Sequence, residues 1–265
     1  MMRGASADAL AGLGDLLKKV GASDEAAVGT DLFGVAGMLR GEAGLRRVAT
    51  DASIDSSAKS GLVSSLLQGK VGQAALDLVA NAVGRRWTAT RDLADALEHL
   101  GVVSVVRSAG DKKRLADELF EVRSMIDDSR DLRSALSDPA RSTSDKQALL
   151  SGLLDGKVLA ATMTLVHQAL AGTHRTIGTA IESYQSIAAD VYDESVATVR
   201  TAKPLSDHDI TRLTAALSAH YGTDVHLNVV VDPDLVGGLR VDIGDDVIDG
   251  SVSSRLDDAR RKLAG

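Results

Sequence analysis

The chain contains no cysteine, and aromatic residues make up only 2% of it. The missing thiols exclude disulfide bonds, thiolate metal sites and cysteine nucleophiles. With so few aromatic side chains, the core has to be built from small and aliphatic residues. Alanine, leucine and valine recur at helical spacing along most of the sequence, and this pattern favours a helix-rich protein.

The sequence also lacks long apolar runs and an excess of positive charge. No run approaches the roughly 20 apolar residues that a helix needs to span a bilayer, and the N-terminus lacks the apolar stretch of a secretory signal. We therefore expect no direct membrane insertion, so that any attachment to a membrane is made through a partner. The formal net charge of −7 argues against nucleic-acid binding.

What the sequence does contain is an internal repeat with a constant offset of 87 residues. The register holds without a gap over residues 32–82, and it includes charged and glycine positions that aliphatic richness alone does not explain. The matching positions are Leu32-Phe33 with Leu119-Phe120, Met38 with Met125, Leu45-Arg46 with Leu132-Arg133, Asp51 with Asp138, Lys59 with Lys146, Gly69-Lys70-Val71 with Gly156-Lys157-Val158, and Leu78-Val79 with Leu165-Val166.

Each copy reads as a series of short helices, which are unstable alone and must pack against one another. The spacing predicts helices over 8–20, 24–39, 42–48, 56–67 and 71–84 in the first copy, over 91–105, 112–126, 130–136, 144–154 and 158–171 in the second, and over 176–192 after it. We therefore expect a mainly α protein with a small α+β C-terminal domain: a helical bundle over 1–87, a second bundle over 88–192, and a small sheet packed with helices over 193–265.

The most particular stretch is the C-terminal run from residue 229 to residue 263. It predicts strands over 225–231 and 239–243, separated by turns, and a terminal helix that Ser251 caps. In the second strand, alternation places Leu239, Val241 and Ile243 on one face. The turn positions are Asp232, Pro233, Gly237, Gly238, Gly244, Asp245, Asp249 and Gly250.

Candidate chemistry in the sequence has a plainer structural explanation in each case. The six histidines are scattered without metal-ligand spacing, and His208 follows Ser206 in what reads as a capped first helical turn. The Gly69-Lys70 and Gly156-Lys157 pairs lack the rest of a phosphate loop and read as helix breaks. The aspartates near Gly244 could bind a cation, although a turn explains them, and the single Trp87 is expected to pack between the bundles. No cofactor, metal or catalytic residue is predicted.

The turn sequence resembles the C-terminal signature of the delta subunit of F-type ATP synthases, the bacterial counterpart of the mitochondrial oligomycin-sensitivity protein. The match covers Asp232-Pro233, Leu235 to Gly238, Gly244-Asp245, Val247 to Ser251 and Leu256. Upstream, residues 119–170 resemble the helical domain of that family and residues 196–205 its domain junction. Family members typically carry one bundle, whereas this chain has two, as in long actinobacterial forms. We expect flexibility at residues 193–203.

The resemblance implies a non-catalytic stator subunit in the peripheral stalk, located on the cytoplasmic side of the bacterial cell membrane. Its helical part would hold N-terminal helices of alpha subunits, and residues 196–265 would receive the b-type stalk subunit. In the second bundle, a family groove between the first and fifth helices implies contacts from Leu93, Leu97, Leu100, Val158, Met163 and Val166. A chain lacking residues 1–84 is then expected to stay soluble. The alternatives are a free-standing helical adaptor and a nucleotide-dependent enzyme, which the missing phosphate loop disfavours.

Overall fold

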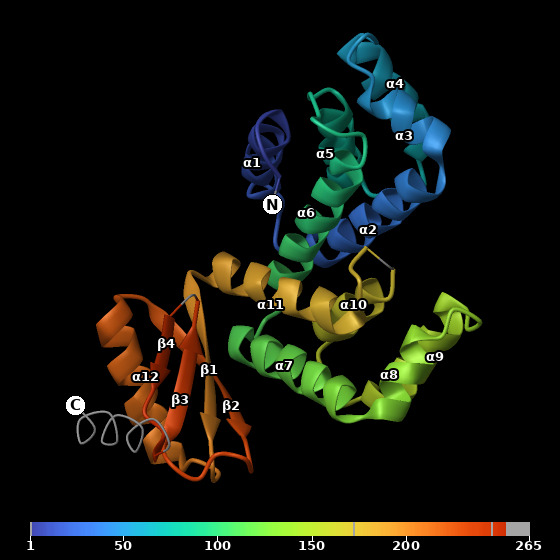
Figure 1. The fold of residues 1–265 in the computed structure, drawn as a ribbon. Helices are drawn as coiled ribbons and strands as arrows, with labels where there is room; N and C mark the ends of the chain where they lie inside the picture. The colour runs from blue at the N-terminus through green and yellow to red at the C-terminus, as the bar shows by residue number, and fades with distance from the viewer. Residues whose placement is uncertain (1, 172, 245, 253–265) are drawn as a thin grey trace, which may run out of the picture. The chain divides into compact units, whose positions relative to one another are not determined.

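A computed structural model describes residues 2–171, 173–244 and 246–252. These ranges form twelve helices and four strands (Figure 1), and they divide into two compact units, Met1–Tyr184 and Gln185–Gly265. The division falls inside the eleventh helix. The structure confirms the predicted fold class of a mainly α chain with a small α+β region near the C-terminus. The domain limits after residues 87 and 192 remain predictions.

The helices confirm the repeat as well. The first copy holds α1 (Ala5–Leu17), α2 (Glu25–Gly41), α3 (Ala43–Thr50), α4 (Ser56–Leu67) and α5 (Gln73–Val83). The second holds α6 (Asp92–Ser108), α7 (Lys112–Asp128), α8 (Arg130–Ser137), α9 (Thr143–Leu154) and α10 (Ala160–Ala169), followed by α11 (Ile177–Tyr192). Every helix from α6 to α10 begins 87 residues after its counterpart in the first copy. The predicted segments match these helices to within a few residues.

Local chemistry explains where several helices start. A side-chain oxygen just ahead of α4, α7, α8 and α9 accepts a hydrogen bond from a free backbone N–H of the first turn, which is the usual role of an N-cap. The four capping residues are Asp55, Asp111, Ser129 and Ser142.

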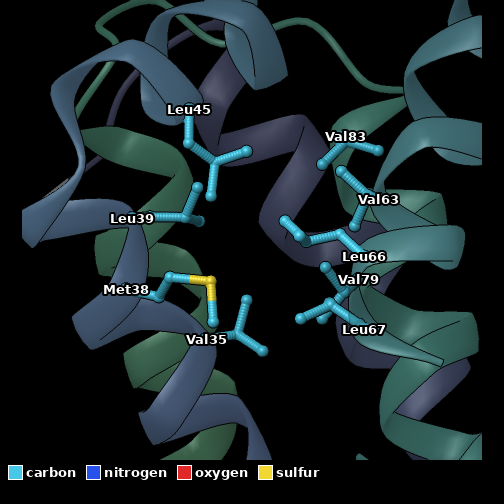
Figure 2. A pocket seen from close by; sticks show the side chains of 9 residues that line it. All are labelled: Val35, Met38, Leu39, Leu45, Val63, Leu66, Leu67, Val79 and Val83. Atoms are coloured by element: carbon cyan, nitrogen blue, oxygen red, sulfur yellow. The ribbon is translucent and has the colours of Figure 1, made fainter. Parts of the chain in front are cut away.

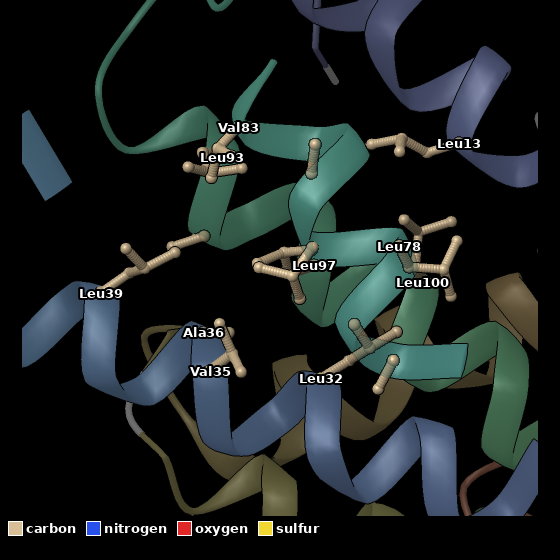
Figure 3. Close-up of a cluster of buried hydrophobic side chains, with 14 of the residues drawn as sticks. Leu13, Leu32, Val35, Ala36, Leu39, Leu78, Val83, Leu93, Leu97 and Leu100 are labelled. Carbon is tan, nitrogen blue, oxygen red and sulfur yellow. The ribbon is translucent and has the colours of Figure 1, made fainter. Parts of the chain in front are cut away.

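In the first unit, one continuous core joins α1, α2 and α5 to α6. Figure 3 shows leucines of α6 facing Leu32, Val35 and Leu39 of α2 and Leu78 of α5. Trp87 lies at the margin of this core, and its indole N–H donates to the carbonyl of Ala82 at 2.9 Å. The first helix of the second copy is therefore part of the hydrophobic core of the first copy.

The second unit is built on a four-stranded sheet with the order β2-β1-β3-β4. Its strands are β1 (Glu194–Thr201), β2 (Asp224–Val231), β3 (Leu239–Ile243) and β4 (Asp246–Asp249). β1 is parallel to β2 and antiparallel to β3, and β3 is antiparallel to β4. Helix α12 (Asp207–Tyr221) connects β1 to β2, and its Leu217 packs in a cluster with Val199 and Val241.

Both predicted strands of this unit are confirmed, and so is the inward face of β3, where Val241 and Ile243 are buried. Residues 194–201 form strand β1, which lies between β2 and β3 and was not predicted, and the flexibility expected at residues 193–203 stays a prediction. One expectation was wrong. Residues 246–249 are a fourth strand rather than a turn that leads directly into a helix. Strand β1 depends on pairing with β2 and β3, which are distant in the chain and which its own sequence does not reveal, whereas β4 forms a local hairpin with β3 across the turn at Gly244.

Candidate interface sites

The first turn of the signature ends β2. The backbone N–H of Asp232 donates to Thr201 at 2.8 Å, and the Asp232 carboxylate then accepts from the N–H of Asp234 at 3.0 Å. Pro233, which has no N–H to offer a ladder, follows directly. Asp232-Pro233 therefore closes the strand, as its sequence predicts.

The second turn brings two backbone segments into close contact. Gly238 has a φ of +83°, and a Cβ placed on it would lie 2.4 Å from the carbonyl oxygen of Gly250. Hydrogen bonds of 2.9 Å, from Gly250 to Leu239 and from Val252 to Gly237, hold the segments together. Only glycine fits this position, since both the dihedral angle and the approach exclude a side chain. The signature glycines therefore have a structural role: they allow the turn conformation and the close approach of the two backbone segments.

The remaining signature residues also serve the turns. Asp249 accepts a hydrogen bond from the backbone N–H of Ser251 at 2.9 Å, and this bond lowers the pKa of the Asp249 carboxyl. Gly244 adopts a φ of +55° in the turn between β3 and β4. Asp245 lies outside the described residues, and so does the body of the terminal helix that Ser251 is predicted to cap.

The six residues predicted to contact a partner helix fall into two groups. Leu93, Leu97 and Leu100 are buried in the core shared with the first copy, and Val166 is fully buried as well. Val158, just before α10, and Met163, on α10, are only partly buried. Their role in binding remains a prediction, and in the described conformation only the second group presents side-chain surface to solvent.

Three of the positions considered for chemistry have a local structural role. Ser206 caps α12 by accepting from the N–H of Asp209 at 3.2 Å, which confirms that His208 lies in a capped first turn. Gly69 and Gly156, with φ of +74° and +71°, follow α4 and α9 as helix breaks. Within the described ranges, no group of three or more His, Asp or Glu residues is placed to hold a metal ion.

An apolar pocket lies within the first copy, between α2 and α3 on one side and α4 and α5 on the other (Figure 2). Nine aliphatic or methionine side chains face it, and Leu66 at its edge is 37% exposed. Its lining contains no polar side chain, so the pocket offers no chemistry for a reaction. The lining residues are Val35, Met38, Leu39, Leu45, Val63, Leu66, Leu67, Val79 and Val83.

The sequence analysis missed a buried carboxylate, Glu98 on α6. Its oxygens accept hydrogen bonds from both copies: from Arg40 at 2.6 Å, Gln168 at 2.9 Å, Thr173 at 2.8 Å and Tyr184 at 3.0 Å. We call these five residues the Glu98 cluster. The available signal was an acidic residue between the apolar positions Leu97 and Leu100 of α6.

The cluster stabilises the ionised form of Glu98. Burial by itself raises the pKa of a carboxyl group, but the hydrogen bond from Gln168, the charge of Arg40 and the hydroxyl donors together lower the Glu98 pKa below its ordinary value. Burial of the ring, and after it the charge of the same carboxylate, raises the pKa of Tyr184. The arrangement is an anchored ion pair whose carboxylate accepts four hydrogen bonds, and both pKa shifts move away from neutral pH.

Comparison with known proteins decides the family. The sequence profile described as ATP synthase delta (OSCP) subunit matches residues 100–263, more than half of the chain. The chain belongs to the ATP synthase delta (OSCP) family. The matched range includes the whole turn signature and most of the second copy, but it begins inside α6. The match therefore leaves out the whole first copy and the first turns of α6.

Relatives of this delta-family chain cover the first copy too. "ATP synthase subunit delta" of a Nocardioides strain is 55% identical over 100% of this chain and 98% of its own length. The protein of the same name from Streptomyces coelicolor is 40% identical over 99% and 98%. The long form is thus shared with actinobacterial relatives. A chain of the Toxoplasma gondii mitochondrial ATP synthase hexamer aligns over 63% of this chain and 95% of its own at 22% identity, with a TM-score of 0.38, too low to bear on the fold.

Proposed function

We propose that this delta-family chain is a non-catalytic stator subunit in the peripheral stalk of an F-type ATP synthase. It links alpha subunits of the catalytic head to the b-type stalk subunit and resists the torque of the rotor during ATP synthesis. The observation that carries the proposal is the full-length identity to ATP synthase delta subunits together with the intact turn signature. A stator needs interface area and stiffness rather than a reactive pocket.

We place the alpha-subunit contact on the second copy. Val158 and Met163 are the predicted contact residues that keep part of their surface accessible, whereas the leucines of α6 are buried against the first copy. An amphipathic partner helix in an apolar groove is a common recognition mode and needs few exposed anchor residues. Met163 suits this role because its flexible thioether adapts to a partner surface.

We place the b-type contact on the second unit. Its described residues expose several large aliphatic side chains in or beside the signature turns, and exposed apolar surface is a common feature of protein interfaces. Their exposed fractions range from 39% to 84%, so burial in a complex would remove considerable apolar area from water. The residues are Val231, Val236, Val247, Ile248 and Val252.

The proposed location is the cytoplasmic side of the bacterial cell membrane, with attachment through the complex. Of the helices within the described ranges, none combines the length and the apolar character needed to cross a membrane. Attachment through partner subunits agrees with that finding. The alternative, a free-standing helical adaptor, gives no reason for the signature turns to be retained.

A pull-down from the native organism, followed by mass spectrometry, tests the proposal. We expect the tagged chain to recover alpha and b-type subunits. Met163→Asp should reduce the recovery of alpha, and Ile248→Asp should reduce the recovery of the b-type subunit. Leu153→Asp is the matched control, because Leu153 is already 38% exposed on a different helix of the second copy. Recovery of other partners without either subunit would reject the stator in favour of the adaptor.

A further inference from the structure

Helix α6 has two counterparts in the repeat. Moving α1 forward by 87 residues starts it at Asp92, the first residue of α6, so α6 is the first helix of the second copy. Moving α11 back by 87 residues places it over residues 90–105, again on α6. The helix that follows the fifth helix of the first copy and the helix that opens the second copy are therefore one and the same.

Burial on α6 reflects both positions. The buried residues of α1 are Ser6, Ala9, Leu13 and Leu17, and their equivalents on α6 are Leu93, Ala96, Leu100 and Ser104, all of them buried. The buried residues Ala180, Ile181 and Tyr184 of α11 correspond to Leu93, Ala94 and Leu97, which are also buried. Helix α6 thus buries both the face that is buried on α1, a first helix, and the face that is buried on α11, a last helix. A helix covered on nearly all sides lies in the interior of a single packed body.

The contact with the first copy is unusually close. A Cβ on Gly101 of α6 would lie 2.6 Å from the ring of Phe33, and one on Gly29 of α2 would lie 2.9 Å from the carbonyl oxygen of Gly101. Both helices therefore need glycine where they cross. Arg107, near the end of α6, also pairs with Glu25 at 2.6 Å. These contacts fix α6 to α2 along its length.

The contact with the second copy runs through the Glu98 cluster. Arg40 belongs to α2 of the first copy, whereas Gln168 and Tyr184 belong to α10 and α11. All of them bind one carboxylate carried by α6. Losing either set of partners leaves a buried charge with incomplete compensation, so the two copies support each other through this residue.

We propose that α6 is a shared helix, the last of the first copy and the first of the second, and that it makes residues 2–184 one cooperative folding unit. The duplicated helical part is then a single stiff body rather than two bundles on a linker. A substitution that destabilises the core of one copy also destabilises the other copy, because unfolding either copy removes packing partners of α6.

Matched substitutions in the full-length chain test this. Val35 and Val122 are equivalent positions in the repeat, and both are buried, on α2 and α7. Trp87 is the single tryptophan and packs against the core of the first copy, so its fluorescence reports that core. We expect Val122→Ala to lower the urea midpoint of the Trp87 transition by about as much as Val35→Ala does, in step with the loss of helical circular dichroism.

Hydrogen exchange gives a residue-level readout of the same comparison. Under the proposal, each of the two variants lowers protection in both α2 and α9, since both helices open in the same event. Val122→Thr replaces Val122→Ala should the latter fail to fold. A Trp87 transition that stays at its wild-type midpoint while part of the helical signal is lost at lower urea overturns the proposal. Loss of protection confined to the mutated copy overturns it as well.

Discussion

Asp31 and Glu118 lie 87 residues apart in sequence and make the same contact. Each carboxylate accepts a hydrogen bond of 2.8 Å from the backbone N–H just ahead of the fifth helix of its copy, Asp31 from Gly72 and Glu118 from Leu159. The repeat is therefore preserved at the level of single hydrogen bonds. The pair differs in its surroundings: Glu118 is buried and also binds Arg114 and Thr162, whereas Asp31 keeps some exposure.

This difference predicts unequal costs for the same substitution. Glu118→Ala should destabilise the chain by about 2–4 kcal/mol, because it removes a charged acceptor and leaves buried donors unpaired. Asp31→Ala should cost only about 1 kcal/mol, the usual value of a helix cap. Urea denaturation of both variants measures the difference. Equal losses would contradict the role assigned to the Glu118 contacts.

Glu98 gives stability a definite dependence on pH. Because its pKa is lower in the folded chain than in the unfolded chain, its ionised form stabilises the fold above the unfolded value, and this contribution disappears as pH falls through the folded value. Glu98→Gln should therefore destabilise the chain by about 2–4 kcal/mol at pH 7. The difference in the free energy of unfolding between variant and wild type should become smaller below pH 4.5, which is the ordinary pKa of glutamate.

Urea denaturation of the wild type and of Glu98→Gln at several pH values checks this expectation. Asp15→Asn is the control, since Asp15 makes an exposed ion pair with Lys18 on α1 and its loss should change little. A stability difference between the two chains that does not change with pH would show that the charge of Glu98 is not what stabilises the cluster.

Alanine substitutions at two glycines should change stability in opposite directions, because Gly101 lies where α6 crosses α2 and Gly152 lies in open space. Gly101→Ala should destabilise the chain by about 1–3 kcal/mol, since the added methyl group meets the Phe33 ring and the carbonyl of Gly29. Gly152→Ala, in α9, has open space around it and should stabilise the chain by about 0.5–1 kcal/mol through helix propensity. Thermal unfolding of the two variants distinguishes packing from propensity, and stabilisation by both would argue against the close crossing.

In the second unit, Gly238→Ala should cost about 2 kcal/mol or more, because the residue has a positive φ and its Cβ would overlap the backbone of Gly250. Hydrogen exchange in β3 and β4 measures the effect. The recovery of the b-type subunit in a pull-down should fall with it. Unchanged protection of β3 would mean that the turn tolerates a side chain.

Deletion of residues 1–84 separates the sequence-based expectation from the structural one. The sequence alone predicted a soluble remainder. The structure leads us to expect aggregation or strong binding of a hydrophobic dye, because the deletion uncovers Leu93, Leu97 and Leu100 on α6. Size-exclusion chromatography and dye fluorescence of the truncated chain decide between the two.

The sequence by itself determined the local structure. Capping residues such as Ser142 and breaks such as Gly156 set the helix limits, and the 87-residue register follows from matching residues alone. Gly238 was recognisable because a positive φ demands a specific residue type. These features depend on residues that are neighbours in the chain, so the amino-acid sequence is sufficient to predict them.

Only the tertiary structure decided how the pieces combine. Strand β1 forms because it pairs with β2 and β3, which are distant from it in the chain, and the role of Glu98 depends on donors as much as 86 residues away. The sharing of α6 was not readable from the repeat, because a periodic pattern shows which residues are apolar but not which partners cover them. Whether a residue is buried depends on the tertiary packing around it. The role of α6 in joining the two copies could therefore be recognised only from the folded structure.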